Sequence, residues 1–266
     1  MTIERRQLLG ASLRWMLLCV LLLTSVSASF SRAEAQSAPQ GNSVQLDDDV
    51  QWPKYREVIF NLSPVLKEVF ATDPGIDSEM RAALLPLIKE MIQTPGDTQL
   101  RDRVNKTYVD ILQKRVTERA MYGASEAINL WGATRLPLYR ALAAVSPESC
   151  GEYVTIGFTN VNSALVGSLF AAAQQAQLDA FKSSDPLRYA LPSRQEVDAA
   201  YEQAKKLLQP PFDDNDAIAF RSLEKYTPAE ACKLATRFVL GVEQLPAATR
   251  AVIYRHWLSE SAPRKK

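Results

Sequence analysis

The feature that most constrains the fold is a helical repeat of apolar residues, which continues through most of the chain from Trp52 onward. In one segment the repeat places on a single face Met80, Leu84, Leu87, Ile88 and Met91, and in the next segment Leu100, Val104, Tyr108, Ile111 and Leu112. Pro95 and Gly96 separate the two segments, as turn-forming residues do. The pattern predicts an all-α fold, an irregular bundle of about eight or nine helices with little or no sheet.

Two of the expected helices have recognisable starts. Ser193 and Glu196 have the spacing of a capping box, in which each side chain accepts a hydrogen bond from the other residue's backbone N–H. An apolar stripe follows, and the helix is expected to end before residues 210–211, which are both proline. Residues 227–230 form a second capping box, so a further helix is predicted to carry Cys232 in its first turns.

Residues 153–178 contain no charged side chain and keep helical spacing, so we expect this segment at the buried centre of the bundle. Residues 154–158 alternate as a strand would, which makes a short extended segment the alternative there. Asn160 and Asn162 also lie in the segment, where an unpaired buried amide would cost about 1–3 kcal/mol. They are candidates to line a polar pocket or to bind a partner's backbone, and an internal hydrogen-bond network is the alternative.

The N-terminus has the three parts of a secretory signal. An apolar run, 15–23, is followed by small residues and preceded by the basic residues Arg5, Arg6 and Arg14. We expect residues 1–35 to be a cleavable signal peptide with cleavage after Ala35, and cleavage after Ala28 is the alternative. Residues 5–9 resemble a twin-arginine signal, although the strongly apolar run is typical of the general secretory route.

The signal sets the expected organisation of the rest of the chain. The polar residues 36–50 should form a flexible leader, and residues 51–266 a single helical domain. A retained membrane anchor would need about 20 apolar residues, more than the run provides, so we expect membrane contact only through the signal. Removing the signal changes the formal charge from +1 to −1. A chain with so little net charge has no strong electrostatic field that would attract nucleic acid.

Cys150 and Cys232 remain after the signal is removed, because Cys19 lies within it. An exported protein meets an oxidising compartment, so we predict a disulfide between them, and two buried free thiols are the alternative. Two cysteines with the single histidine, His256, do not make an ordinary structural zinc site. We therefore expect no metal and no cofactor.

Catalytic candidates are few. His256, near the end of the last expected helix, could act as a general base, although a lone histidine there is also a favourable cation at a helix C-terminus. Glu148 and Glu152 flank Cys150 in what we predict to be a loop, and a glycan-cleaving enzyme could use such a glutamate as its acid or base. The alternative is a turn at Pro147 with a glutamate at the next helix N-terminus.

A binding candidate lies on a helix that we predict over residues 124–145. Aromatic and arginine side chains are enriched at binding hot spots, and here they recur every four residues as Trp131, Arg135 and Tyr139. Gly132 and Pro137 should bend this helix and could open a groove. The alternative is that these three residues, which have helical spacing, belong to the core.

The function predicted from these features is a non-catalytic binding or structural module of the bacterial cell envelope, periplasmic or secreted. Its expected partner is a protein or a small ligand of the envelope. Two alternatives stay open: an envelope glycan hydrolase that uses Glu148 or Glu152, and a small-ligand carrier with a cavity around Asn160 and Asn162.

Overall fold

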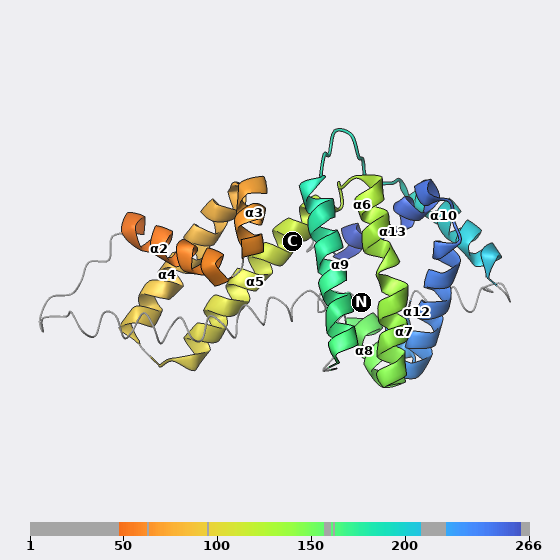
Figure 1. Ribbon diagram of the computed structural model, residues 1–266, viewed down its shortest axis with the longest axis horizontal. Helices are drawn as coiled ribbons and strands as arrows, with labels where there is room; N and C mark the ends of the chain where they lie inside the picture. The colour runs from red at the N-terminus through yellow and green to blue at the C-terminus, as the bar shows by residue number, and fades with distance from the viewer. Residues whose placement is uncertain are drawn as a thin grey trace, which may run out of the picture. The chain divides into compact units, whose positions relative to one another are not determined.

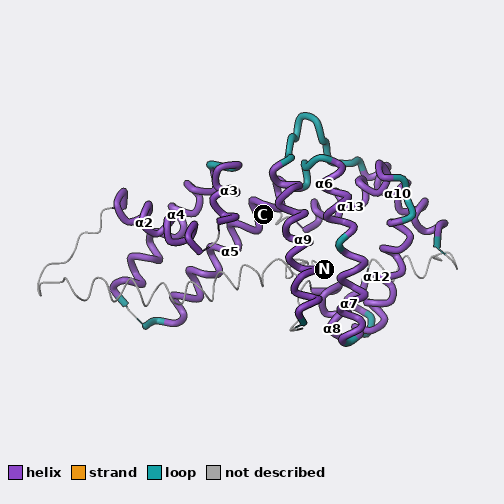
Figure 2. The backbone as a smooth tube through the Cα atoms, in the orientation of Figure 1, coloured by secondary structure: helices purple, strands orange, loops and turns teal. Residues whose placement is uncertain are grey.

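The structure, a computed structural model, describes residues 48–62, 64–94, 96–156, 161, 163–208 and 222–261. These residues form helices joined by short loops and contain no strand, which confirms the all-α prediction (Figure 2). They form more helices than the eight or nine expected. The signal segment 1–35 and residues 36–47 of the leader lie outside the described residues. In the part of the chain that is described, none of the helices is both long and apolar enough to span a bilayer.

Residue contacts divide the chain into two compact units, and the boundary between Arg115 and Val116 falls inside a helix. We describe each unit by itself. The expectation of a single domain over residues 51–266 stays a prediction. The first helix of the described residues begins at Asp48, within the last residues of the expected leader.

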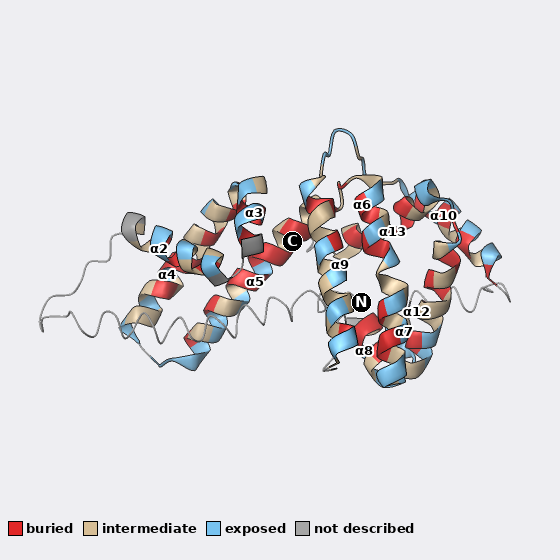
Figure 3. Ribbon diagram, viewed as in Figure 1, coloured by how far each residue is buried: buried red, intermediate tan, exposed pale blue. Residues whose placement is uncertain are grey.

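The unit that ends at Arg115 contains α2 (Asp48–Leu62), α3 (Pro64–Thr72), α4 (Gly75–Gln93) and most of α5 (Thr98–Ala120). The predicted faces of α4 and α5 form its core, as the buried residues in Figure 3 show, with Met80, Leu84, Leu100 and Leu112 at 1% exposure or less. Polar pairs join the helices at the edge of this core. Trp52 Nε1 and Arg56 Nη1 each donate to Asp77 at 3.0 Å, and Arg115 Nε donates to Glu79 at 2.6 Å.

The unit that begins at Val116 contains the end of α5 and then α6 (Ser125–Ala133), α7 (Arg135–Val145), α8 (Pro147–Ile156), α9 (Ala164–Lys182), α10 (Arg194–Leu207), the short 3-10 helix η1 (Leu223–Lys225), α12 (Pro228–Glu243) and α13 (Ala247–Ser261). Both predicted capping boxes are present. Glu196 N bonds to Ser193 Oγ, and Glu230 N bonds to Thr227 Oγ1, with the return bonds in place at both sites. Cys232 lies in the first turns of α12, as expected.

The single helix expected over 124–145 is wrong, because two helices meet at Thr134 (Figure 1). Pro137 explains the break. A proline inside a helix has no N–H to bond four residues back, and its ring clashes with that carbonyl. The residue four positions before Pro137 is Ala133, where α6 ends. Pro137 instead occupies the first turn of α7, where no such bond is needed.

The loop expected around Cys150 is wrong, since α8 is helical from Pro147 to Ile156. The short extended segment given as the alternative at 154–158 is not formed by its described residues, 154–156, which are helical as the main prediction had it. Ser146 starts the helix, with its Oγ accepting from Ser149 N at 3.2 Å. Cys150, Tyr153 and Val154 are its buried apolar side chains, at helical spacing. Packing of this buried face of α8 outweighs the strand-like alternation of apolar and polar residues in the local sequence. Residues 157–158 lie outside the described part.

The charge-free segment forms the end of α8 and then α9, and only one face of α9 is buried. Val166, Ala173 and Phe181 face the core, while Leu165 is 62% exposed. The expected central position is therefore wrong for α9. One face of α9 packs against α6 and α7 and covers these two helices from one side. The opposite face of α9 is left to solvent.

Candidate functional site

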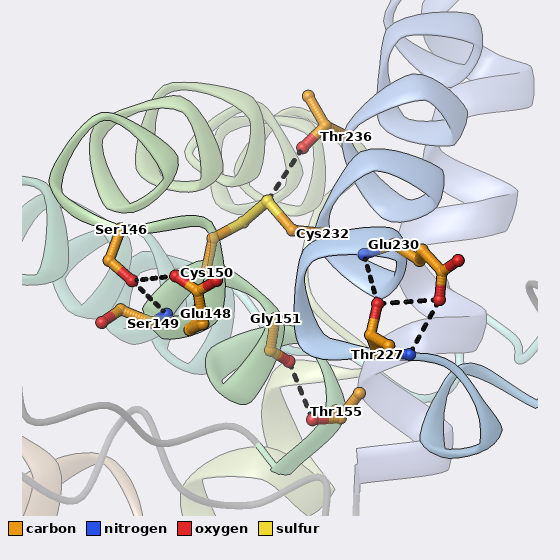
Figure 4. Close-up of a disulfide and its surroundings, with 10 residues drawn as sticks. All are labelled: Ser146, Glu148, Ser149, Cys150, Gly151, Thr155, Thr227, Glu230, Cys232 and Thr236. Atoms are coloured by element: carbon orange, nitrogen blue, oxygen red, sulfur yellow. Dashed lines mark hydrogen bonds between the residues drawn. A yellow bond between two sulfur atoms is a disulfide. The ribbon is translucent and has the colours of Figure 1, made fainter.

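The disulfide predicted between Cys150 and Cys232 is present and joins α8 to α12 (Figure 4). The two Cα atoms lie 5.4 Å apart, and both residues are buried. Thr236 Oγ1, one turn further along α12, lies 3.9 Å from Cys232 Sγ. The bridge fixes α8, and with it the residues that α8 presents toward α7 and α9.

One of those residues, Tyr153, belongs to a group that we call the aromatic–arginine cluster, which consists of Trp131, Arg135, Tyr139, Tyr153 and Phe170. Four helices contribute to it: α6, α7, α8 and α9. The structure thus brings together the three residues predicted from their spacing and adds two that the sequence did not indicate.

Arg135 lies at the centre of the cluster. Its Cζ lies 4.1 Å from the ring centre of Trp131, a cation–π distance, and its Nη1 donates to Tyr153 Oη at 2.8 Å. The Tyr153 ring in turn packs edgewise against Tyr139 and Phe170, with ring centres 6.0 and 5.4 Å apart. The guanidinium is therefore flanked by aromatic rings.

Two donors in the cluster are buried and have no partner: Nε1 of Trp131 and Nε of Arg135. No carboxylate of the described residues lies within ion-pair distance of Arg135, which donates a hydrogen bond to the neutral phenol of Tyr153. Buried polar groups in folded proteins are nearly always paired, so two unpaired donors in one cluster need an explanation. An acceptor supplied from outside the chain would provide one.

Burial controls the protonation of the two phenols. It raises the pKa of Tyr139 to about 12, with Arg135 opposing the shift. Burial also raises the pKa of Tyr153, and the charge and hydrogen bond of Arg135 act in the opposite direction. Both hydroxyls stay protonated at neutral pH and can donate.

The cluster reaches the surface through three of its residues. Trp131 and Tyr153 are 5% and 4% exposed, whereas Arg135, Tyr139 and Phe170 are half-buried. The alternative interpretation is that the stripe belongs to the core. It is correct for Trp131, which is buried, but it does not account for the unpaired donors.

A second polar group adjoins the cluster on the α13 side. The rings of Trp131 and Tyr254 meet edge to face at 6.5 Å, because Gly132 leaves the room that the Tyr254 ring occupies. Tyr254 Oη donates to Glu243, which also pairs with Arg250 at 3.2 Å. Burial and the Glu243 carboxylate raise the pKa of Tyr254 above its usual range. Nothing in the local sequence pattern indicated these long-range partners.

The two glutamates predicted as catalytic candidates are exposed on α8. Ser146 Oγ donates to Glu148 at 2.7 Å, and this bond lowers the pKa of the Glu148 carboxyl. A glycosidase general acid needs the opposite shift. Glu148 lies in the first turn of α8, the arrangement given above as the alternative. The hydrolase function stays a prediction that this geometry does not favour.

His256, the other catalytic candidate, is half-buried on α13, with its ring 6.0 Å from that of Tyr201. Burial lowers its pKa, and the carboxylates of Glu260 and Asp198 oppose that shift. Within the described residues, no group of three or more His, Cys, Asp and Glu side chains could hold a metal ion. Asn160 and Asn162 lie outside the described residues, so the pocket predicted around them stays a prediction.

No protein-family model matches this chain, and comparisons with curated proteins and with solved structures also give no match.

Proposed function

We propose that the mature chain is a non-catalytic binding module of the bacterial cell envelope, periplasmic or secreted, and that the aromatic–arginine cluster is its binding site. The observation that carries the proposal is the pair of unpaired buried donors on Trp131 and Arg135. Each such group costs about 1–3 kcal/mol when it has no acceptor. Both atoms have almost no exposed surface, so a partner that supplies acceptors recovers this free energy only if the cluster opens on binding.

The composition of the cluster supports the same function. Arginine and tryptophan are the side chains that carry most binding energy in protein recognition. Here they stack on each other, and the disulfide-fixed α8 holds Tyr153 against the guanidinium. Side chains held in place lose little freedom when they bind, so more of the interaction free energy appears as affinity.

The proposed location rests on the signal pattern in residues 1–35 and agrees with the disulfide, a bond that persists in oxidising compartments. Cell fractionation followed by mass measurement of the unreduced mature protein tests it. We expect the mass of a chain that starts at residue 36 or at residue 29. That mass should be two hydrogens below the mass of the same chain after reduction. Full-length protein in the cytoplasm would contradict the proposed export.

The binding function is tested with the mature protein isolated from the envelope. Native mass spectrometry and affinity capture should show one partner on the wild type, whether a small molecule or a protein, and loss of that partner in Arg135→Gln. Arg140→Gln is the matched control, because Arg140 is exposed on the same helix, α7. Equal retention by both variants, or no partner on the wild type, would contradict the proposal.

A further inference from the structure

We propose that the α9–α10 loop, residues 183–193, binds an anionic lipid surface by placing Leu187 and Leu191 among the acyl chains. The proposal goes beyond the function proposed for the aromatic–arginine cluster and does not depend on it, because the loop contains no residue of that cluster. It follows from the exposure of Leu187, on a turn that hydrogen bonds hold in place and with basic residues beside it.

The α9–α10 loop is long, apolar and exposed. Connections between helices in bundles usually have about 2–8 residues, and this loop is longer. It rises beyond the adjoining ends of α9 and α6 (Figure 2), and most of its residues are exposed (Figure 3). Leu187 is 99% exposed, Leu191 is 39% exposed, and Pro186 and Ala190 beside them are exposed as well. Apolar side chains gathered on a surface in this way mark an interaction site.

Hydrogen bonds hold the turn that carries Leu187. Asp185 Oδ1 accepts from Leu187 N at 3.0 Å and from Arg188 N at 3.3 Å. Tyr189 N donates to the Asp185 carbonyl at 2.8 Å, and Asp185 N donates to the Tyr122 carbonyl at 2.9 Å, which ties the loop to the end of α5. The exposure of Leu187 therefore belongs to a defined turn. A side chain presented in this way loses little freedom on binding.

The charged side chains beside the leucines are mainly basic. Arg188 lies in the turn, Lys182 and Arg194 flank the loop at its two ends, and all three are exposed. Asp185 is the one carboxylate between Lys182 and Arg194, so this stretch has a formal charge of +2. The next two carboxylates along the chain are engaged on α10, one with Arg194 at 3.7 Å and the other in the capping box. The charge next to the apolar tip complements anionic lipid headgroups.

The size and shape of the loop favour a lipid surface over a protein partner. A stable protein interface takes about 20–30 residues from each side, far more than this loop presents. A projecting apolar tip with basic neighbours matches the layers of a membrane interface, where leucines reach the acyl chains and basic heads stay with the phosphates. Tyr189, half-buried in the loop, has the amphipathic ring found at headgroup level. This contact belongs to the mature chain, in addition to the one expected through the signal.

Vesicle flotation of the mature, disulfide-bonded protein tests the proposal. The probes are vesicles of phosphatidylglycerol and phosphatidylcholine in equal parts, and vesicles of phosphatidylcholine alone. We expect the wild type to bind the anionic vesicles at least about tenfold more tightly than the neutral ones, because three basic residues adjoin the tip. Arg188→Gln should bind the anionic vesicles about fivefold more weakly.

Leu187→Ser should bind the anionic vesicles at least about tenfold more weakly, because a serine gains nothing from the acyl chains. Leu165→Ser is the matched control. Leu165 is 62% exposed and lies in the first turn of α9, at the end of that helix away from the loop. Leu165→Ser should bind as the wild type does. Thermal unfolding should show that both variants keep the fold, since each changes an exposed side chain.

The outcomes separate this proposal from the function proposed for the cluster. Arg135→Gln should bind vesicles as the wild type does, whether or not it loses an envelope partner. A wild type that does not bind the anionic vesicles would overturn the lipid proposal and leave the cluster's function untouched. Equal binding by Leu187→Ser and Leu165→Ser would overturn it as well, because the leucine of the loop would then play no part in the contact.

Discussion

Gly151 on α8 lies directly against the backbone of Pro228 on α12: a Cβ placed on residue 151 would be 1.9 Å from the Pro228 carbonyl oxygen. The contact lies next to the Cys150–Cys232 disulfide, so the two helices are both bonded and closely packed at this point (Figure 4). Only a residue without a side chain allows this approach. The position of α8 therefore depends on glycine at residue 151 as well as on the disulfide.

Replacing Gly151 with alanine should destabilise the protein by about 1–3 kcal/mol, because the methyl group forces the helix backbones apart. Gly167→Ala on α9 is the matched control, since its Cβ would meet nothing within 4 Å and alanine favours a helix. Urea unfolding of both variants measures the difference. The close approach is refuted if Gly151→Ala proves as stable as Gly167→Ala.

Removing the disulfide with Cys150→Ala and Cys232→Ala together should lower the free energy of unfolding by about 4 kcal/mol, the chain-entropy value for a closed loop of this size. The two cysteines are 82 positions apart. Urea unfolding with and without reductant provides the measurement. Reductant should weaken the wild type and leave the double variant unchanged, whereas equal sensitivity of the two proteins would show that the bond contributes nothing.

Stability should fall at alkaline pH because of buried tyrosines. Burial raises the pKa of Tyr55 from 10.0 to about 12. Between these values the unfolded chain loses the phenol proton while the folded chain keeps it, so stability decreases as pH rises, by at most about 1.4 kcal/mol per pH unit for one group. Urea unfolding between pH 9 and about pH 11 should show a smaller decrease for Tyr55→Phe than for the wild type.

The control for this series is Tyr226→Phe, because Tyr226 is 39% exposed. It should keep the alkaline decrease of the wild type. The other buried tyrosines remain in both variants, so the decrease is reduced in Tyr55→Phe and not abolished. An equal decrease in all three proteins would exclude a contribution from Tyr55.

Arg255→Lys should cost about 2 kcal/mol, because an ammonium cannot replace the two-armed contact of the guanidinium. Arg255 is 5% exposed and donates from Nη1 to the Met121 carbonyl at 2.7 Å and from Nη2 to the Gly123 carbonyl at 2.9 Å. Amide hydrogen exchange at residues 121–124 should speed up as well. Arg194→Lys, with a side chain that is 95% exposed, is the control. If Arg255→Lys and Arg194→Lys have the same stability and the same amide exchange at residues 121–124, the structural role of Arg255 is refuted.

Features that depend on neighbours in sequence were predictable. The capping box of Ser193 and Glu196 joins groups three residues apart, and so does that of Thr227 and Glu230. The buried faces of α4 and α5 follow the 3.6-residue repeat. The spacing of Trp131, Arg135 and Tyr139 predicted three of the five residues of the candidate site. Arg135 and Tyr139 face the same way because they are four apart on α7, whereas Trp131 lies on α6.

Features that depend on distant parts of the chain were not predictable. The alternation at residues 154–158 suggested a strand, and packing against α12 made the described part of that stretch helical. Tyr153 and Phe170 joined the cluster because α8 and α9 both lie against α7, and no local pattern encodes that arrangement.

The sequence by itself determined where several helices begin, which faces they bury and which two cysteines remain to pair, because each depends on local spacing or on counting. The tertiary structure alone decided that Arg135 meets Tyr153 while its Nε stays unpaired. The physical reason is that packing brings together helices far apart in the chain, and the pairing of a buried polar group depends on what those helices place beside it.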